Sequence, residues 1–190
     1  SRGDWANSLA ASVQPASLGH TQTQGAQPED GRSSYVNNLS GFEAGSIVRL
    51  SQGALEATTY RRVDEINPHL RQLVWDKPID SFGFDLTASI QLETVEFTLL
   101  IHRDGQIVER HRDLCLAPGH SRYVGAIVQA NSILVDVAVL LDLEAGDWAD
   151  PTNWPADADR LPLSGGHDGP ATGTGDDFLE GLHALALVDE

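Results

Sequence analysis

Several short motifs in the sequence contain residue types that could do chemistry. His111-Arg112-Asp113-Leu114 matches the start of the catalytic loop of protein kinases, in which the aspartate accepts the proton of the substrate hydroxyl. That loop also needs an asparagine at position 118 to hold a metal ion, and this chain has Pro118 there. Because neither a glycine-rich phosphate loop nor a lysine strand precedes the motif, it predicts the end of a hairpin strand.

A glycine-rich segment, Gly165 to Gly175, looks like a phosphate-binding turn at the start of a helix. A phosphate loop continues with lysine and serine or threonine, whereas Gly175 is followed by Asp176 and Asp177, which would repel phosphate. The segment therefore predicts a turn and a helix N-cap.

Metal binding has weak support in the sequence. Five loop aspartates could gather around a calcium ion, but their spacing fits no EF-hand loop: Asp157, Asp159, Asp168, Asp176 and Asp177. The seven histidines form no zinc-binding pattern, and His102 and His111, expected to face each other across a hairpin, supply only two ligands. We therefore predict no catalytic, cofactor-binding or metal-ligating residue, no cofactor, and no enzymatic activity.

Composition narrows the choice of partners. The formal net charge of −16 argues against nucleic acid, whose phosphates need clustered Lys and Arg. No apolar run reaches the roughly 18 residues of a membrane span, so no membrane partner is predicted. Cys115 is the single cysteine and stands between two leucines, which predicts a buried thiol.

Alternation and turn signals predict mostly short strands. We expect strands at 5–13, 46–51, 58–66, 69–75 and 82–102, and a hairpin turn at Asp104-Gly105 with a return strand over 106–111. Helical spacing appears at 121–130 and 175–186, and the apolar run 132–141 predicts a strand buried on both faces. The predicted fold class is α+β, with a mixed β-sheet, two or three helices and a small inserted β-barrel-like module.

An ordered set of motifs resembles the tail sheath proteins of phages and other contractile injection systems. Its members are Trp5-Ala6-Asn7, Phe42-Glu43-Ala44-Gly45, Ser121-Arg122-Tyr123-Val124 and Leu163-Ser164-Gly165-Gly166 with Asp168-Gly169. Ala6 replaces the usual glycine of the first motif, and the third lacks its usual proline. The resemblance implies a sheath α+β domain at 1–13 and 80–190 that continues past residue 190. It leaves 14–34 as a flexible linker and 35–79 as an inserted small β module.

The resemblance also implies a mechanical function. Sheath subunits polymerise with one another as a helical tube around an inner tube, and contraction triggered at a baseplate drives that tube through a target envelope. The partners would be other copies of the subunit, with the inner tube protein and the baseplate contacted through parts outside this chain. The expected location is the bacterial cytoplasm during assembly, then a phage tail or extracellular contractile particle.

Two sets of surface residues follow as candidates. Basic groups on an acidic chain can pair with acidic neighbours, which makes Arg103, Arg110, Arg112 and Arg122 candidate inter-subunit contacts, although a solvated strand face is the competing interpretation. The alternative function is a carbohydrate- or host-binding β module of a phage-like particle, in which Tyr60 and Trp75 would be exposed together.

Overall fold

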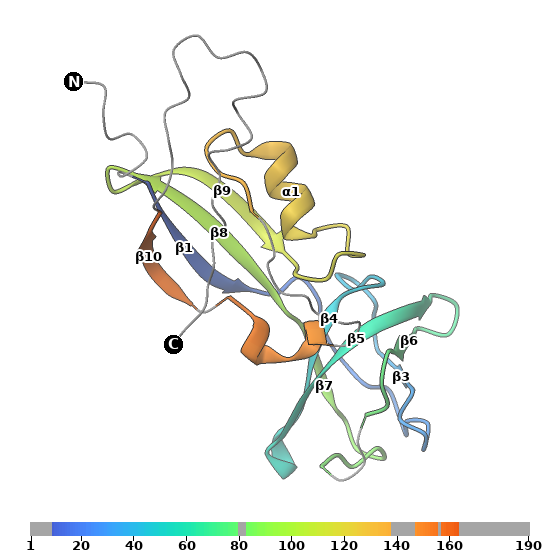
Figure 1. The fold of residues 1–190 in the computed structure, drawn as a ribbon. Coiled ribbons are helices and arrows are strands. Elements are labelled where there is room, and N and C mark those ends of the chain that lie inside the picture. The colour runs from blue at the N-terminus through green and yellow to red at the C-terminus, as the bar shows by residue number, and fades with distance from the viewer. Residues whose placement is uncertain (1–8, 80–82, 138–146, 156, 164–190) are drawn as a thin grey trace, which may run out of the picture.

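The computed structural model describes residues 9–79, 83–137, 147–155 and 157–163. These residues form two antiparallel β-sheets, one beyond the other, with a shared junction between them (Figure 1). We call the six-stranded sheet and its loops the barrel module, and the four-stranded sheet with its helix the sheet module.

The barrel module is built from short strands. In spatial order they are β2 (His20–Gln22), β7 (Gln91–Thr94), β4 (Ile47–Gln52), β5 (Ala57–Asn67), β6 (Gln72–Trp75) and β3 (Ser33–Tyr35). The two edges meet where Thr23 and Val36 form an antiparallel bridge, and the Asn37 amide donates to the Gln22 carbonyl beside it. The sheet therefore curls into a half-barrel whose edges are joined along one short stretch.

Alternation along β4 shows why this sheet encloses a core. Val48 and Leu50 are fully buried, while Arg49 between them is exposed and pairs with Glu93 of β7. Equivalent positions from the other strands and loops complete an apolar cluster: Val36, Phe42, Val63, Leu73, Trp75, Ile79, Phe84, Ile90 and Leu92. A short 3₁₀ helix, η2 (Gly53–Leu55), connects β4 to β5 at the far end of the module.

The sheet module has the order β10 (Ala158–Pro162), β1 (Leu9–Ala16), β8 (Glu96–Arg103) and β9 (Gln106–Leu114). The hairpin predicted at Asp104-Gly105 is confirmed, and both residues have positive φ, 51° and 80°, as a two-residue primed turn requires. The single α-helix of the described residues, α1 (Val124–Asn131), follows β9 and packs on one face of this sheet (Figure 1). Its buried side chains, Val124 and Val128, join a cluster with Ala11, Val13, Leu99, Ile101, Leu114 and Leu116.

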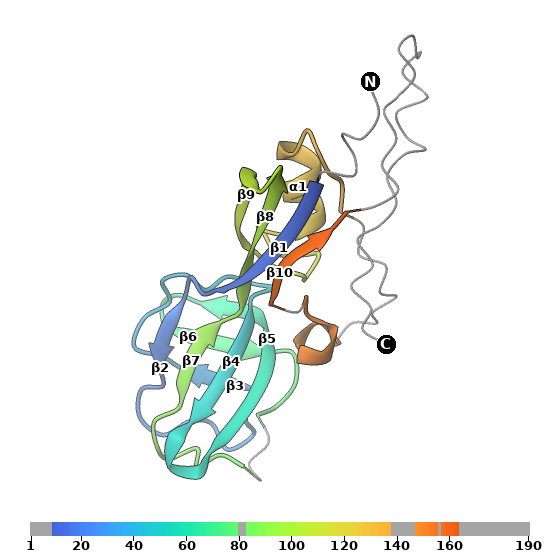
Figure 2. The ribbon, with the colours of Figure 1, turned by 90° about the vertical axis from the view of Figure 1, so that its left-hand side faces the viewer.

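Two segments pass directly from one module to the other (Figure 2). β7 continues into β8 across Val95, whose amide donates to the Ile47 carbonyl, and β1 leads into β2 over residues 17–19. Two 3₁₀ helices, η3 (Asp147–Ala149) and η4 (Pro151–Asn153), lie against this crossing. A small core of Ile47, Cys115 and Ala117, with Trp148 and Trp154 packed against it, joins the modules.

The predicted α+β class is wrong for the described residues, which are mostly β-strand with one α-helix. Every sheet pairing is antiparallel, so the strands need no crossover helices. The predicted helix over 175–186 lies outside the described residues. Residues 132–137 of the predicted strand 132–141 form no strand, because the Ser132 hydroxyl accepts the amides of Leu134 and Val135 and turns the chain.

The module boundaries also differ from those expected. The predicted 35–79 insert supplies β4, β5 and β6, but β2, most of β3, and β7 lie outside it. Residues 14–34, predicted as a flexible linker, include the end of β1, all of β2 and the start of β3. Polar composition concealed these strands because several of their buried positions, Thr21, Ser33 and Ser34, carry polar side chains. The Ser34 hydroxyl, for example, accepts from the indole N–H of Trp75.

Candidate functional site

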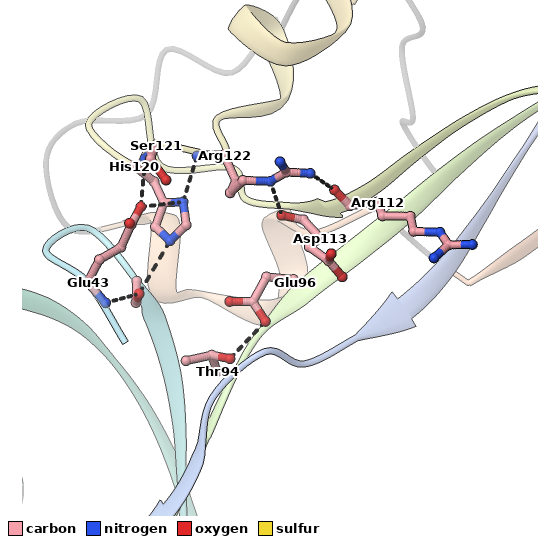
Figure 3. A network of polar contacts seen from close by, with 9 residues as sticks. Glu43, Thr94, Glu96, Arg112, Asp113, His120, Ser121 and Arg122 are labelled. Atoms are coloured by element: carbon pink, nitrogen blue, oxygen red, sulfur yellow. Dashed lines mark hydrogen bonds and ion pairs between the residues drawn. The ribbon is translucent and has the colours of Figure 1, made fainter. Parts of the chain in front are cut away.

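The four candidate contact arginines lie on the β8–β9 hairpin and the loop that follows it. Arg110 and Arg112 are exposed on β9, and Arg103 is half-buried at the end of β8. Arg122 instead folds back onto its own chain, where its guanidinium donates to the carbonyls of Arg112 and Asp113 (Figure 3). The structure therefore gives Arg122 an internal role and leaves Arg110 and Arg112 presented to solvent.

The two candidate binding aromatics do not share an exposed surface. Trp75 is only 2% exposed and belongs to the barrel core, where its indole N–H donates to the Ser34 hydroxyl at 3.0 Å. Tyr60 is half-buried, with its ring edge-to-face against Trp154 at a centroid distance of 4.7 Å. Both rings therefore serve packing, and the arrangement that the alternative function needs is not formed by this pair.

A group of polar residues joins the modules at their junction, where Ser46 and His120 are buried and Glu43 is partly exposed (Figure 3). Glu43 and Ser46 come from the loop between β3 and β4, whereas His120 and Ser121 come from the loop between β9 and α1. Glu43 accepts the Ser121 amide at 2.7 Å and lies 3.1 Å from His120 Nδ1, while His120 Nε2 contacts the Ser46 hydroxyl at 3.3 Å. These contacts join loops that are more than seventy residues apart in the sequence.

A close backbone approach at the same place depends on Gly45. This residue has a φ of 90°, and an added Cβ would lie 3.2 Å from the amide nitrogen of His120. Glycine therefore permits both the left-handed turn and the contact between the two loops.

Burial shapes the ionisation of this group. Desolvation lowers the pKa of His120, an effect that the Glu43 carboxylate opposes and Arg122 reinforces. Burial would raise the pKa of Glu43, but the hydrogen bonds with Ser121 and the charges of His120 and Arg122 together outweigh it, and the net shift is downward. The site therefore favours a neutral imidazole beside an ionised carboxylate.

Glu96, the first residue of β8, is a second buried carboxyl at the junction. It is 3% exposed, and its Oε2 accepts from the Leu18 amide at 2.9 Å and the Thr94 hydroxyl at 2.8 Å. Its other oxygen, Oε1, is buried without a hydrogen-bond partner. Desolvation raises the pKa of Glu96, and the nearby carboxylates of Asp113 and Glu43 add to that shift.

A pocket of about 220 Å³ lies beside Glu96. Its wall is predominantly apolar and draws on both modules and on the η4 region, with Val13, Ile47, Phe97, Leu116 and Trp154 among the residues lining it. A concave apolar site with one buried polar group has the character of a ligand pocket.

Sequence reasoning missed two buried polar pairs in the sheet module. Ser12 of β1 lies 2.8 Å from His102 of β8, a serine–histidine contact, but both are buried and His102 Nδ1 has no partner that would orient a catalytic base. Glu109 accepts from the Ser132 hydroxyl and the Ile133 amide and contacts His111 at 3.1 Å, which attaches the end of α1 to β9. Both networks connect elements of the fold.

No local signal marked the contacts between Ser12 and His102 or between Glu109 and Ser132, because the partners lie on different elements. His102 and His111, expected to face each other, are instead opposite Ile107 and Leu99, because a two-residue turn at Asp104-Gly105 places His102 only two residues before the turn and His111 six residues after it. The kinase-like motif His111-Arg112-Asp113-Leu114 forms the last four residues of β9, as predicted for the end of a hairpin strand.

The described residues contain no group of three or more His, Cys, Asp or Glu side chains placed to hold a metal ion. Asp168, Asp176 and Asp177 of the predicted calcium cluster lie outside the described residues, as does the Gly165–Gly175 turn. Within the described ranges, no helix has the length and apolar character needed to cross a membrane.

Comparisons with family models, curated proteins and solved structures find no match for this chain.

Proposed function

We propose that this chain is part of a structural subunit of a contractile tail sheath, which polymerises around an inner tube and contracts to drive it through a target envelope. The ordered sequence resemblance is the basis of this proposal. It covers segments from Trp5 to Gly169, and the motifs occur in the family's order.

One structural observation supports it. Phe42-Glu43-Ala44-Gly45 and Ser121-Arg122-Tyr123-Val124, two of the resembling motifs, meet at the junction between the modules. Glu43 accepts the Ser121 amide, and Gly45 lies against His120 next to the second motif. Residues that the resemblance selects separately thus take part in one set of contacts.

The architecture suits a part that transmits force. β7 and β8 run through the junction with one residue, Val95, between them, and a buried core of Ile47, Cys115 and Ala117 lies beside the crossing. Load applied to one module passes to the other through continuous backbone and packed side chains. A subunit of this kind moves as a rigid body between the two packings of a bistable assembly.

Contacts between subunits would involve Arg110 and Arg112. Both are exposed on β9, which pairs on one side with β8 and presents basic groups on a chain with a net charge of −16. Opposite charge on a neighbouring copy would guide their approach, although each exposed pair contributes only up to about 1 kcal/mol.

Negative-stain electron microscopy of the complete gene product, expressed alone and with its inner-tube partner, tests the proposal. We expect hollow, regularly striated cylinders, and a product that remains monomeric under both conditions would contradict the sheath function.

A matched pair of variants tests the arginine contacts. Arg110→Glu with Arg112→Glu should reduce cylinder formation, because both charges reverse on the exposed strand. Arg32→Glu with Lys77→Glu makes the same charge change at exposed positions of the barrel module and should leave assembly intact. If the two double variants formed cylinders to the same extent, Arg110 and Arg112 would not contribute to the contacts between subunits.

A further inference from the structure

His120 has two competing partners for one ring nitrogen. The Arg122 amide donates to its Nδ1 at 3.0 Å, and an oxygen of the Glu43 carboxylate lies 3.1 Å from the same atom (Figure 3). A ring nitrogen carries either a lone pair, which accepts, or a proton, which is donated. Nδ1 therefore cannot accept from Arg122 and donate to Glu43 at the same time.

The contacts of the neutral imidazole select one tautomer. Because Nδ1 accepts the Arg122 amide, the proton lies on Nε2, which donates to the Ser46 hydroxyl at 3.3 Å. That hydroxyl also accepts the Glu43 amide at 3.0 Å. In this state Nδ1 and the ionised Glu43 oxygen beside it are both acceptors, so they form no hydrogen bond with each other.

Protonation of the ring reverses this pairing. When the imidazole takes up one proton from solvent, Nδ1 becomes a donor, so it loses the Arg122 amide and gains a charge-assisted hydrogen bond to Glu43. Nε2 keeps its proton and its contact with Ser46. His120 lies in the loop after β9 of the sheet module, whereas Glu43 and Ser46 belong to the barrel module. One hydrogen bond from His120 to the barrel module therefore becomes two.

We propose that His120 is a pH-operated latch between the two modules, bonded to the Arg122 amide of its own loop when neutral and to Glu43 of the barrel module when protonated. Acidification thus strengthens the direct connection between the modules and releases the turn that contains Arg122. This latch is independent of the sheath proposal.

The surrounding charges set the pH at which the latch moves. Glu43 favours the imidazolium, whereas burial and the Arg122 guanidinium oppose it, so the pKa of His120 lies below its ordinary value of about 6.5. The pKa of Glu43 is itself lowered, which keeps this carboxylate ionised while the ring titrates. The next acidic groups at the junction are Glu96, which interacts with Glu43, and Asp113, which interacts with Glu96.

NMR of the unmodified chain, labelled with ¹⁵N, tests the latch, and His120→Gln identifies the ring signals. We expect the Nε2–H tautomer at pH 7.5. As the pH falls and Nδ1 protonates, the protection of the Arg122 amide against exchange with solvent, corrected for the intrinsic effect of pH, should fall by about tenfold, the ratio that 1.4 kcal/mol gives. The Ser121 amide should stay protected, because Glu43 accepts it in both states.

Three results would overturn the proposal. An Nδ1–H tautomer at pH 7.5 would mean that Glu43 already accepts from the neutral ring. Unchanged protection of the Arg122 amide after protonation would mean that the partners do not exchange. A ring that stays neutral until the chain unfolds would mean that the latch does not operate in the folded state.

A matched pair of variants isolates the role of Glu43. Glu43→Gln removes the charge but keeps an oxygen that can accept the Ser121 amide, so the pKa of His120 should fall below that of the unmodified chain. Glu29→Gln removes the same charge at an exposed position of the barrel module and should leave that pKa unchanged. If both variants left the pKa of His120 unchanged, Glu43 would not be the partner of the imidazolium. Because the ring titration is measured on the unmodified chain, a variant that fails to fold does not prevent a decisive result.

Discussion

At the residue scale, the buried carboxyl of Glu96 makes the stability of the folded chain depend on pH. Burial raises its pKa, so the folded chain holds this proton more tightly than the unfolded chain does. As pH rises from the unfolded value of about 4.3 towards the raised folded value, the folded state loses stability. We expect the free energy of unfolding to fall with rising pH relative to that of Glu96→Gln, which cannot titrate there. Urea denaturation between pH 4.5 and 7.5 measures this difference.

The control for this experiment is Glu29→Gln, which removes one carboxylate at an exposed position. The difference between the unmodified chain and Glu96→Gln should depend on pH more steeply than the difference measured for this control. If both stability differences depended on pH to the same extent, burial of Glu96 would not shift its pKa.

His120 responds to pH in the opposite direction. Desolvation lowers its pKa, so the unfolded chain takes up the proton first as pH falls. The stability that the neutral imidazole contributes is complete above about pH 6.5, the pKa of histidine in an unfolded chain. It decreases as the pH falls below that value, until the pKa of the folded state is reached. We expect the chain to lose stability relative to His120→Gln between pH 7 and 5.5, as measured by urea denaturation. The same comparison with His20→Gln, at an exposed position, should show a weaker dependence.

At the element scale, the β8–β9 hairpin depends on the left-handed conformation of its turn. Gly105 has a φ of 80°, which any other L-residue adopts only at a cost, so Gly105→Ala should destabilise the chain by about 1 kcal/mol. Gly53→Ala is the matched control, because Gly53 has no positive φ and no atom within 4 Å of an added Cβ. Thermal unfolding of both variants distinguishes strain at the turn from a general effect of adding a methyl group. Equal melting temperatures would contradict the role of the turn.

The same elements show what sequence could and could not predict. The hairpin, α1 and strands β4 to β6 follow local rules, because turn residues and periodic apolar side chains define each of them. β2 and β3 are three residues long and polar, and they form because partners on β7 and β6 pair with them. The candidate site escaped prediction for a related reason: Glu43, Glu96 and His120 lie on three separate elements, and only the packing of two modules brings them together.

At the scale of the whole molecule, the continuous crossing from β7 to β8 and the shared junction core predict that the two modules unfold together. Cys115 can report this, because it is the single cysteine and lies at the junction with 1% exposure. Burial raises the pKa of its thiol to about 11, so the folded chain offers little thiolate to a labelling reagent. Labelling therefore requires that the junction open.

If opening is global, the free energy obtained from Cys115 labelling rates should equal the free energy of unfolding in urea, within about 0.5 kcal/mol. Glu43→Ala removes the acceptor of the Ser121 amide from a partly exposed position, so it should lower both quantities together, by about 1 kcal/mol. Ser40→Cys in a Cys115→Ala background places the thiol at an exposed position and should label at the intrinsic rate.

A labelling free energy well below the urea value would mean that the modules separate before either unfolds. In that case the junction would act as a hinge, and a sheath built from this chain would contract by bending its subunits as well as by rotating them.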